Sequence, residues 1–316
     1  MAGAPTRRLA CRAPLHLPRP RCYGSSSALR AGASVSVEVH ARHGIDTCTT
    51  IAKMAAAVLA AEMSAEMLEQ FAERVGLRRA DLTADLPSLR ALAAAMTSTV
   101  AFENLDCALG RGVDTALPAV YAKIVTAGRG GYCFENNTLI HHVLVALGYD
   151  VSRRVARVVL GPSPSGFTHL VNMVRLPADV PGGSGGGEYL VDVGFGGNSL
   201  RAPLPLASLL DVQLAPGAVG RVGRPVLMYP DVHRLVDDCE VSCLPPGGYR
   251  LQSFQPNKWH EAGMPAAEGP GAAAAGCWVS QYAFHPGQPV CDRDIVTGSH
   301  YVSTLISPSN FFTGCR

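Results

Sequence analysis

The sequence predicts an α+β protein in which a helical N-terminal part precedes a series of antiparallel strands. Between residues 64 and 148 the apolar residues recur with the period of an α-helix. After Gly148 the period shifts towards two, which is typical of strands with one buried face. The 316-residue chain also has 33 glycines and 23 prolines, too many turn-forming residues for a helical bundle or a coiled coil alone.

Residues 1–60 differ in composition from the rest of the chain. The first 45 residues carry seven arginines, no lysine and one glutamate, whereas the remainder has a net charge of −4. An Arg-, Pro- and Ser-rich segment with little acid is typical of an organelle transit peptide, although its prolines interrupt the amphipathic helix of a mitochondrial signal. We expect a disordered extension, either a transit-like leader or an artefact of gene prediction. The expected location is cytoplasmic, with organelle targeting by residues 1–50 as the alternative.

Composition excludes several functional classes for the main part of the chain. Its slight excess of acidic residues disfavours nucleic-acid binding. The longest apolar run near the N-terminus, Met54–Ala61, is far shorter than the ~20 residues of a membrane-spanning helix. The ten cysteines include no CxxC pair and no His–Cys ligand spacing, so neither a metal site nor a disulfide framework is predicted.

Four helices are expected, with apolar stripes at residues 67–75, 89–96, 120–125 and 139–147. Gly76, Gly128 and Gly148 follow the first, third and fourth stripes, where a glycine commonly ends a helix. The second stripe follows Asp85 and Pro87, which are typical of a helix start.

Three strands are expected after the helices, at residues 149–159, 169–176 and 188–193. The glycine-rich stretch Gly182–Gly187 joins the last two, so they should form a hairpin with its turn near Pro181. In an antiparallel hairpin the start of the first strand lies opposite the end of the second. His169 and Asp192 should therefore lie near each other.

The segment Arg129–Asn137 is the place where a reactive side chain is expected. Gly130 and Gly131 release the backbone just before Cys133, and Cys133 opens the clearest helix of the chain. A thiol there meets unpaired backbone N–H groups and the positive end of the helix dipole, and both favour the thiolate. The other nine cysteines are expected to be small buried hydrophobic residues.

A thiolate nucleophile needs a base and a group that orients the base. His141 and His142 lie eight and nine residues after Cys133 on the same expected helix, too far to reach it, so we expect them on the helix surface. His169 begins a strand, and Asp192 lies in the neighbouring strand among tyrosine, leucine and valine. A carboxylate in such a strand is costly unless it is paired. Pairing with an imidazole gives a Cys133–His169–Asp192 triad.

Several short segments stand in order along the chain: Phe102–Asp106 (FENLD), Arg129–Asn137 (RGGYCFENN), Thr168–Leu170 (THL), Val191–Gly196 (VDVGFG), Trp278–Tyr282, His300–Thr304 and Ser307–Phe312. Their residues, order and spacing resemble those of the arylamine N-acetyltransferase family. The resemblance covers roughly residues 64–313.

The resemblance implies a three-part α+β architecture with a cysteine-protease-like catalytic core. A helical bundle, residues 61–148, would carry the nucleophile, and an antiparallel β-barrel, residues 149–270, would carry the histidine and the aspartate. Residues 271–316 would form an α/β lid that is truncated in comparison with the family.

The resemblance also implies an activity and a set of contacts. Acetyl-CoA would acetylate Cys133, with His169 as base and Asp192 as its orienting partner, and the thioester would then react with an arylamine, arylhydrazine or N-hydroxyarylamine in a ping-pong sequence. The residues matching CoA contacts are Ser165, Gly166, Tyr301 and Ser309. Thr168 and His169 match positions that touch the acceptor. No metal is implied, and we expect a monomer whose partners are CoA and a small-molecule acceptor.

Three alternatives remain open at this stage. A related thiol hydrolase or transglutaminase-like enzyme would share the triad but transfer acyl groups to water or to a lysine. A relative that closes amide bonds in macrocyclic polyketides would share the motifs and use carrier-bound substrates. A non-catalytic remnant without a full lid would bind without forming an acyl-enzyme.

Overall fold

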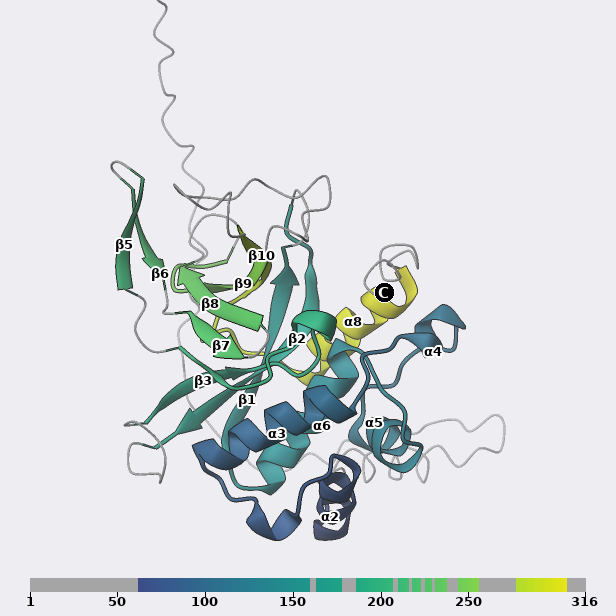
Figure 1. Cartoon of the computed structure of the whole chain (residues 1–316). Coiled ribbons are helices and arrows are strands. Elements are labelled where there is room, and N and C mark those ends of the chain that lie inside the picture. Colours follow the sequence, from purple (N-terminus) through teal and green to yellow (C-terminus); the bar gives the residue numbers. More distant parts are fainter. Residues whose placement is uncertain are drawn as a thin grey trace, which may run out of the picture. The chain divides into compact units, whose positions relative to one another are not determined.

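The computed structural model describes residues 62–159, 163–177, 186–206, 210–215, 218–222, 225–228, 231–237, 244–255 and 277–305. Helices dominate the first part of this range and antiparallel strands the second, as Figure 1 shows. The α+β class is therefore confirmed. The predictions for residues 1–60 and for Ser309 lie outside the described residues.

The four expected helices are present, close to their predicted positions. They are α2 (Ala65–Arg74), α3 (Leu86–Thr99), α5 (Leu117–Tyr121) with the π-helical turn η2 (Ala122–Thr126), and α6 (Cys133–Ala146). Local sequence explains two of the starts, because Ser64 and Asp85 accept hydrogen bonds from the backbone N–H groups of Met67 (3.1 Å) and Ser88 (2.7 Å). None of the described helices is both long and apolar enough to span a bilayer.

Shorter helical segments lie between and after these helices. They are η1 (Arg79–Asp81), α4 (Leu105–Ala108), η3 (Gly196–Asn198), α8 (Asp292–His300) and the π-helical turn η5 (Tyr301–Leu305).

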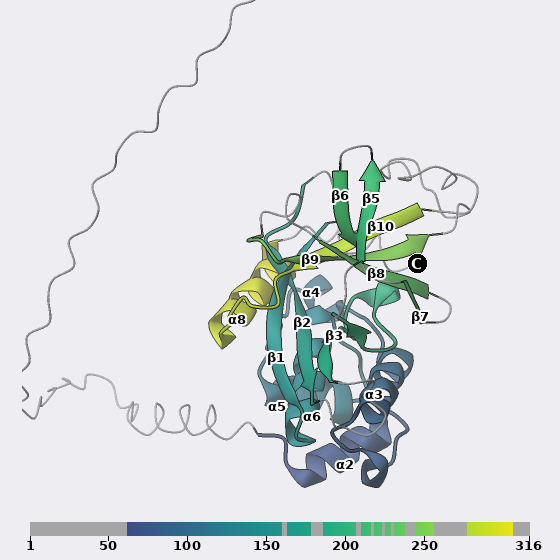
Figure 2. The same cartoon turned by 90° about the vertical axis from the view of Figure 1, so that its left-hand side faces the viewer.

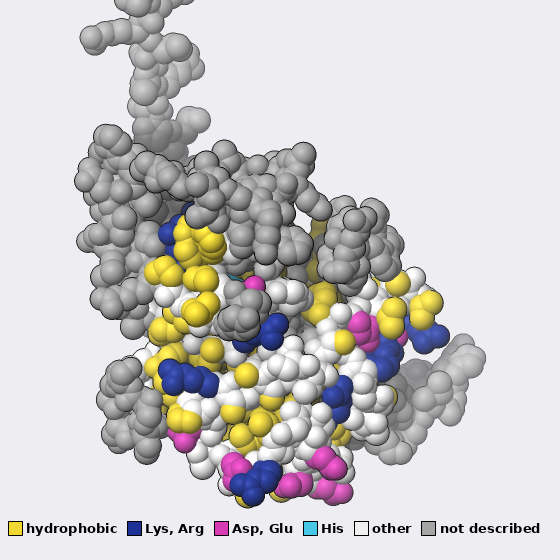
Figure 3. Space-filling view, in the orientation of Figure 1, with side chains coloured by type: hydrophobic (Ala, Val, Ile, Leu, Met, Phe, Trp, Pro, Cys, Tyr) yellow, Lys and Arg dark blue, Asp and Glu magenta, His cyan; other side chains and the backbone are white. Residues whose placement is uncertain are grey.

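Figure 3 shows basic and acidic side chains interspersed on one face, with both signs present around α2 and near α4.

The strands form one antiparallel sheet in the order β4-β3-β2-β1-β10-β9-β8-β6-β5, with β7 paired to β8. Their bounds are β1 (Asp150–Val158), β2 (Phe167–Leu176), β3 (Gly187–Val191), β4 (Leu204–Pro205), β5 (Leu210–Ala215), β6 (Ala218–Val222), β7 (Val226–Met228), β8 (Asp231–Asp237), β9 (Tyr249–Gln255) and β10 (Cys277–Phe284). In Figure 2, β1–β3 run upright while β8–β10 run across them. The sheet therefore bends strongly between β1 and β10, as the wall of a barrel does.

Two apolar cores lie on either side of β1–β3. One core joins the helices to these strands and contains Phe71, Leu89, Leu144 and Val174. The other lies inside the curved sheet and contains Val171, Leu190 and Tyr282. Alternate residues of β2 thus enter opposite cores, which fixes its register between α6 and the barrel.

The C-terminal elements join the barrel and the nucleophile helix. β10 falls within the range predicted for the lid, residues 271–316, yet it pairs with β1 and β9 in the barrel sheet. Helix α8 packs against β2, and its Ile295 shares a small core with Cys133 and Phe134. The domain boundaries themselves stay predictions.

Candidate active site

Cys133 is the first residue of α6, and its side chain is enclosed. The residue is only 5% exposed, and its Sγ donates a hydrogen bond to the backbone carbonyl of Thr168 at 3.8 Å. Thr168 directly precedes His169 on β2. The fold therefore brings the predicted nucleophile beside the strand that carries the predicted base.

His169 and Asp192 meet in the interior, as the hairpin register predicts. The imidazole Nε2 lies 2.8 Å from Asp192 Oδ2, and the two side chains are 1% and 0% exposed. The second carboxylate oxygen, Oδ1, accepts hydrogen bonds from Asn137 Nδ2 (2.8 Å) and from the backbone N–H of Gly194 (3.0 Å). The carboxylate is thus held by side-chain and backbone donors together.

Asn137 contacts the carboxylate of the site, and the sequence does not identify it as a functional residue. It follows Cys133 by four residues on α6, so both side chains lie on one face of the helix. The Asn137 amide nitrogen donates hydrogen bonds to the Leu170 carbonyl (2.7 Å) and to Asp192. The side-chain oxygen of Asn137 accepts a hydrogen bond from the backbone N–H of Val193 (3.1 Å). The spacing of four residues from the nucleophile was the available signal.

A β-bulge at Thr168 positions the strand next to the thiol. Ala156 pairs with His169 and Arg157 pairs with Phe167, so Thr168 is an extra residue on β2. The Thr168 carbonyl accepts the hydrogen bond from the Cys133 thiol, and the Thr168 hydroxyl lies 2.7 Å from Ser165 Oγ. The bulge therefore links the nucleophile to the turn that contains Ser165.

Two aromatic rings surround the imidazole of His169. The ring centroids of Phe195 and Tyr282 lie 4.8 Å and 4.7 Å from its centroid. Tyr282 is completely buried, and burial raises the pKa of its phenol well above the usual value, with the Asp192 carboxylate adding to the effect. Tyr282 therefore stays neutral and keeps water from the imidazole.

The thiol and the carboxylate have shifted proton affinities. Burial raises the pKa of Cys133, and the negative charge of Asp192 raises it further, whereas the backbone N–H groups of Phe134 and Leu170 lower it. The sequence predicts a thiol pKa lowered by the helix start, but the loss of hydration is the larger effect here. Burial also opposes ionisation of Asp192, yet His169, Asn137 and Gly194 together hold its pKa below the usual range.

Gly194 lets the chain after β3 pass close to the nucleophile. A Cβ atom at this position would lie 2.8 Å from Asn137 Nδ2 and 2.9 Å from Cys133 Cα. Only a glycine avoids these two contacts. The glycine therefore serves the packing of Asp192 against the first turn of α6.

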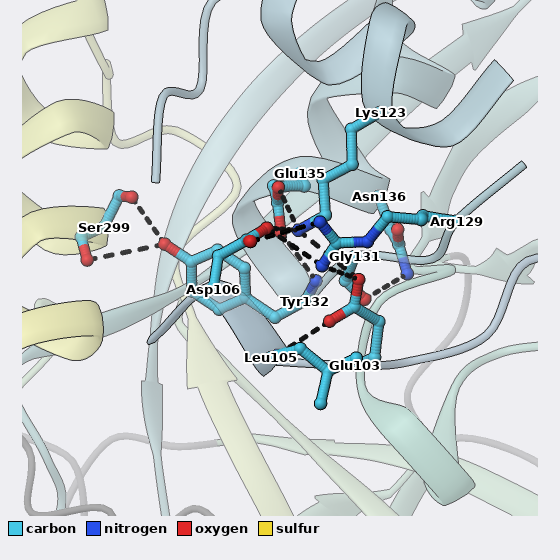
Figure 4. Close-up of polar contacts among 10 residues, drawn as sticks. All are labelled: Glu103, Leu105, Asp106, Lys123, Arg129, Gly131, Tyr132, Glu135, Asn136 and Ser299. Atoms are coloured by element: carbon cyan, nitrogen blue, oxygen red, sulfur yellow. Dashed lines mark hydrogen bonds and ion pairs between the residues drawn. The ribbon is translucent and has the colours of Figure 1, made fainter. Parts of the chain in front are cut away.

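A network of five charged side chains supports the nucleophile turn, and Figure 4 shows it between α4, η2 and α6. Lys123 Nζ lies 2.8 Å from carboxylate oxygens of both Asp106 and Glu135, and 3.5 Å from Glu103. Arg129 Nη2 lies 2.8 Å from Glu103 and 3.0 Å from Asp106. Two cations therefore contact three carboxylates in a mostly buried cluster, which leaves one carboxylate more than there are cations.

The network is connected directly to the turn before the nucleophile. Glu135 Oε2 accepts the backbone N–H of Tyr132 at 3.1 Å, and Asn136 donates its amide to the Gly131 carbonyl at 3.0 Å. The Tyr132 hydroxyl reaches Ser299 on α8, so the turn is tied on both sides. These contacts fix the backbone conformation from which Cys133 enters α6.

Replacing Gly130 by alanine is expected to lower the free energy of unfolding by about 3 kcal/mol. A Cβ atom there would lie 2.0 Å from the backbone oxygen of Ala101, and that oxygen accepts the Gly131 N–H at 3.1 Å. Urea-induced unfolding would measure the loss. Gly197→Ala is the control, because its Cβ atom would meet nothing within 4 Å. Equal stability of the two variants would show that the Ala101–Gly131 contact can shift freely.

A pocket of about 540 Å³ lies between β2 and α8. Gly166, Thr168 and Tyr301 line it, so the fold brings together three residues that the sequence predicts to contact CoA or the acceptor. Ser165 adjoins it and donates from Oγ to the Gly166 carbonyl at 2.7 Å. The described residues contain no group of three or more His, Cys, Asp or Glu side chains arranged to hold a metal ion.

The chain is similar to several known proteins. A family model described as N-acetyltransferase matches residues 85–226. The arylamine N-acetyltransferase of Mycolicibacterium smegmatis is 45% identical over 128 residues, which are 39% of this chain and 44% of the relative. That of Mycobacterium tuberculosis strain H37Rv is 43% identical over 141 residues, or 44% and 48% of the two chains. The alignments thus span about half the length of these curated relatives.

Solved structures match over a longer range. The Mycobacterium marinum arylamine N-acetyltransferase is 33% identical and has a TM-score of 0.57, covering 76% of this chain and 72% of its own. The same enzyme in complex with CoA is 32% identical with a TM-score of 0.56, covering 78% and 74%.

Proposed function

The chain belongs to the arylamine N-acetyltransferase family, and we propose that it transfers an acetyl group from acetyl-CoA, through a thioester on Cys133, to an aromatic amine. The acceptor would be an arylamine, an arylhydrazine or an N-hydroxyarylamine. One observation carries the proposal: the thiol of Cys133 contacts the carbonyl next to His169, and the His169 imidazole is held by buried Asp192 at 2.8 Å.

In the first half-reaction His169 would take the thiol proton. Its Nε2 is engaged with Asp192, so Nδ1 is the nitrogen that would receive the proton. Because burial raises the pKa of Cys133, a thiolate would form here only as the partner of the resulting imidazolium, which Asp192 stabilises. Sulfur would then form a bond to the acetyl carbon, the bond from that carbon to CoA sulfur would break, and the imidazolium would protonate the departing CoA thiolate.

In the second half-reaction the acceptor nitrogen would attack the thioester. A C–N bond would form, the bond to Cys133 sulfur would break, and His169 would carry the amine proton to the thiolate. The buried surroundings of the imidazole, including Phe195 and Tyr282, would disfavour water as the competing acceptor.

The pocket beside Thr168 is proposed to take the donor. Gly166 and Tyr301 line it and Ser165 adjoins it, and a solved relative binds CoA. Ser309 is proposed as a further CoA contact by family resemblance alone, and Thr168 with His169 as the acceptor contacts. We also propose that the protein acts as a cytoplasmic monomer on small molecules.

Intact-protein mass spectrometry tests the proposed function. Incubation with acetyl-CoA alone should add one acetyl group, and the adduct should be absent in Cys133→Ala. A later addition of an aniline or hydrazine should remove the adduct and yield the acetylated amine. Cys291→Ala is the control, because Cys291 is also a free cysteine but is exposed. An adduct that persists in Cys133→Ala, or that decays to acetate in the presence of amine, would contradict the proposal.

A further inference from the structure

Arg157 is not itself a lining residue of the pocket between β2 and α8, but it contacts Phe167, which lines the pocket, and Ser165 beside it. Its Nη1 donates to the backbone carbonyl of Ser165 at 3.0 Å, and its guanidinium carbon lies 4.2 Å from the centroid of the Phe167 ring. Phe167 and Gly166 themselves line the pocket. The guanidinium is therefore stacked on the strand-side wall of the pocket.

The positive charge of Arg157 is not neutralised by a carboxylate within the described part of the chain. Two other arginines of β1 and β2 are paired with carboxylates, Arg153 with Asp292 at 2.6 Å and Arg175 with Glu188 at 2.7 Å, whereas Arg154 donates to backbone carbonyls. In Arg157, moreover, Nε is buried and has no hydrogen-bond partner. A cation held in this way next to a pocket is suited to an anionic ligand.

The opposite wall has the opposite charge. Helix α8 contributes Asp294, whose pKa is lowered by the backbone N–H and side chain of Cys291, so it is ionised at neutral pH. An anionic group in the pocket would be repelled from α8 and attracted towards Arg157. The charge distribution thus gives the pocket a preferred side for a ligand with a negative end.

We infer that Arg157 binds a phosphate group in the nucleotide half of the acyl donor. This inference rests on the proposed function, which supplies acetyl-CoA as the donor. The thioester would lie towards Cys133, the pantetheine arm would pass along Gly166 and Thr168, and the phosphate would meet the guanidinium edge. Stacking on Phe167 holds the guanidinium plane in place and leaves its edge N–H groups to donate to phosphate oxygens.

Two acyl donors separate phosphate binding from other roles of Arg157. Acetyl-CoA and acetyl-pantetheine share the thioester and the arm, but only acetyl-CoA carries phosphates. Arg157→Gln is expected to raise KM for acetyl-CoA about tenfold with little change in kcat, because a charge-assisted contact is lost. KM for acetyl-pantetheine should stay unchanged. Arg157→Lys keeps the charge and should recover part of the loss.

Arg175→Gln is the matched control, since its arginine is paired with Glu188 on an exposed surface, and neither donor should be affected. If Arg157→Gln raised KM equally for both donors, Arg157 would merely position the Ser165 turn, and the inference would be overturned. Unchanged KM values for both donors would overturn it as well.

Equilibrium binding keeps this inference separate from the proposed function. Isothermal titration with CoA and with pantetheine requires no acetyl transfer. Weaker CoA binding by Arg157→Gln, with unchanged pantetheine binding, would support the phosphate contact even if Cys133 were never acetylated. CoA binding that is indifferent to the substitution would overturn the inference even in an active enzyme.

Discussion

Asp192→Asn is expected to slow the acetylation of Cys133 by about 10⁴-fold, by analogy with the loss of the buried aspartate from other catalytic triads. Asp192 accepts a hydrogen bond from His169 Nε2. This contact leaves the other ring nitrogen of His169, Nδ1, able to take the thiol proton. An asparagine amide can present its N–H₂ to the ring and favour the wrong tautomer. It also cannot stabilise an imidazolium. Single-turnover acetylation, followed by mass spectrometry, would measure the rate.

The pH dependence of thiol alkylation gives this prediction a second readout. The Asp192 charge by itself raises the pKa of Cys133, so removing it would make an isolated thiol more acidic. A triad predicts the opposite outcome, because the imidazolium that pairs with the thiolate is lost. In Asp192→Asn, alkylation by iodoacetamide at mildly acidic pH should therefore fall. Unchanged alkylation and acetylation rates would rule out the triad, and Arg175→Gln serves as the surface control.

Lys123→Met is expected to reduce the free energy of unfolding by about 3 kcal/mol, because it removes one partner from a buried ionic cluster. Lys123 is the cation that contacts both Asp106 and Glu135 at 2.8 Å, and its side chain is only 11% exposed. The matched surface pair is Arg78 with Asp81, whose side chains are 83% and 56% exposed. Arg78→Met should cost less than about 1 kcal/mol.

The loss in Lys123→Met should depend on pH. Burial raises the pKa of Glu135, although Lys123 and the Tyr132 N–H counteract the shift. Its folded-state pKa thus lies above the unfolded value, so proton uptake favours the folded state. Without Lys123 the shift grows, and the destabilisation should increase from about pH 4 to pH 7. The double variant Lys123→Met/Glu135→Gln should recover part of the lost free energy of unfolding. Urea unfolding at several pH values measures both effects. A destabilisation that does not change with pH, or a double variant no more stable than Lys123→Met, would contradict this prediction.

Local patterns in the sequence predict the four helices α2, α3, α5 and α6 and the first three strands well, but not α4 or α8. The apolar stripe at residues 139–147 and the period-two segments after Gly148 correspond to α6 and to β1–β3. The contact between His169 and Asp192 could also be predicted, because a carboxylate inside an apolar strand needs a partner. Both inferences use residues that are close in sequence or joined by one hairpin.

The parts that could not be predicted depend on contacts between distant segments. The insertion of β10 between β1 and β9 is set by the whole sheet, and no local pattern contains it. The raised pKa of Cys133 depends on burial among Leu170, Ile295 and Val302, whereas the sequence argument considered only the helix start. The spacing of Asn137 from Cys133 places both side chains on one face of α6, but the identity of its partner, the Asp192 carboxylate, depends on a contact between distant segments.

Because the site includes residues from distant parts of the chain, its contacts can form only in a certain order during synthesis. Helices α2–α6 and strands β1–β3 are complete by residue 191, but Tyr282, which packs on His169, comes from β10. Tyr132, next to the thiol, waits for Ser299, 167 residues later. Of the described elements, β10 and α8 are therefore the last strand and α-helix to emerge from the ribosome, so the contacts that enclose His169 and Tyr132 can form only after residues 62–191 have been synthesised.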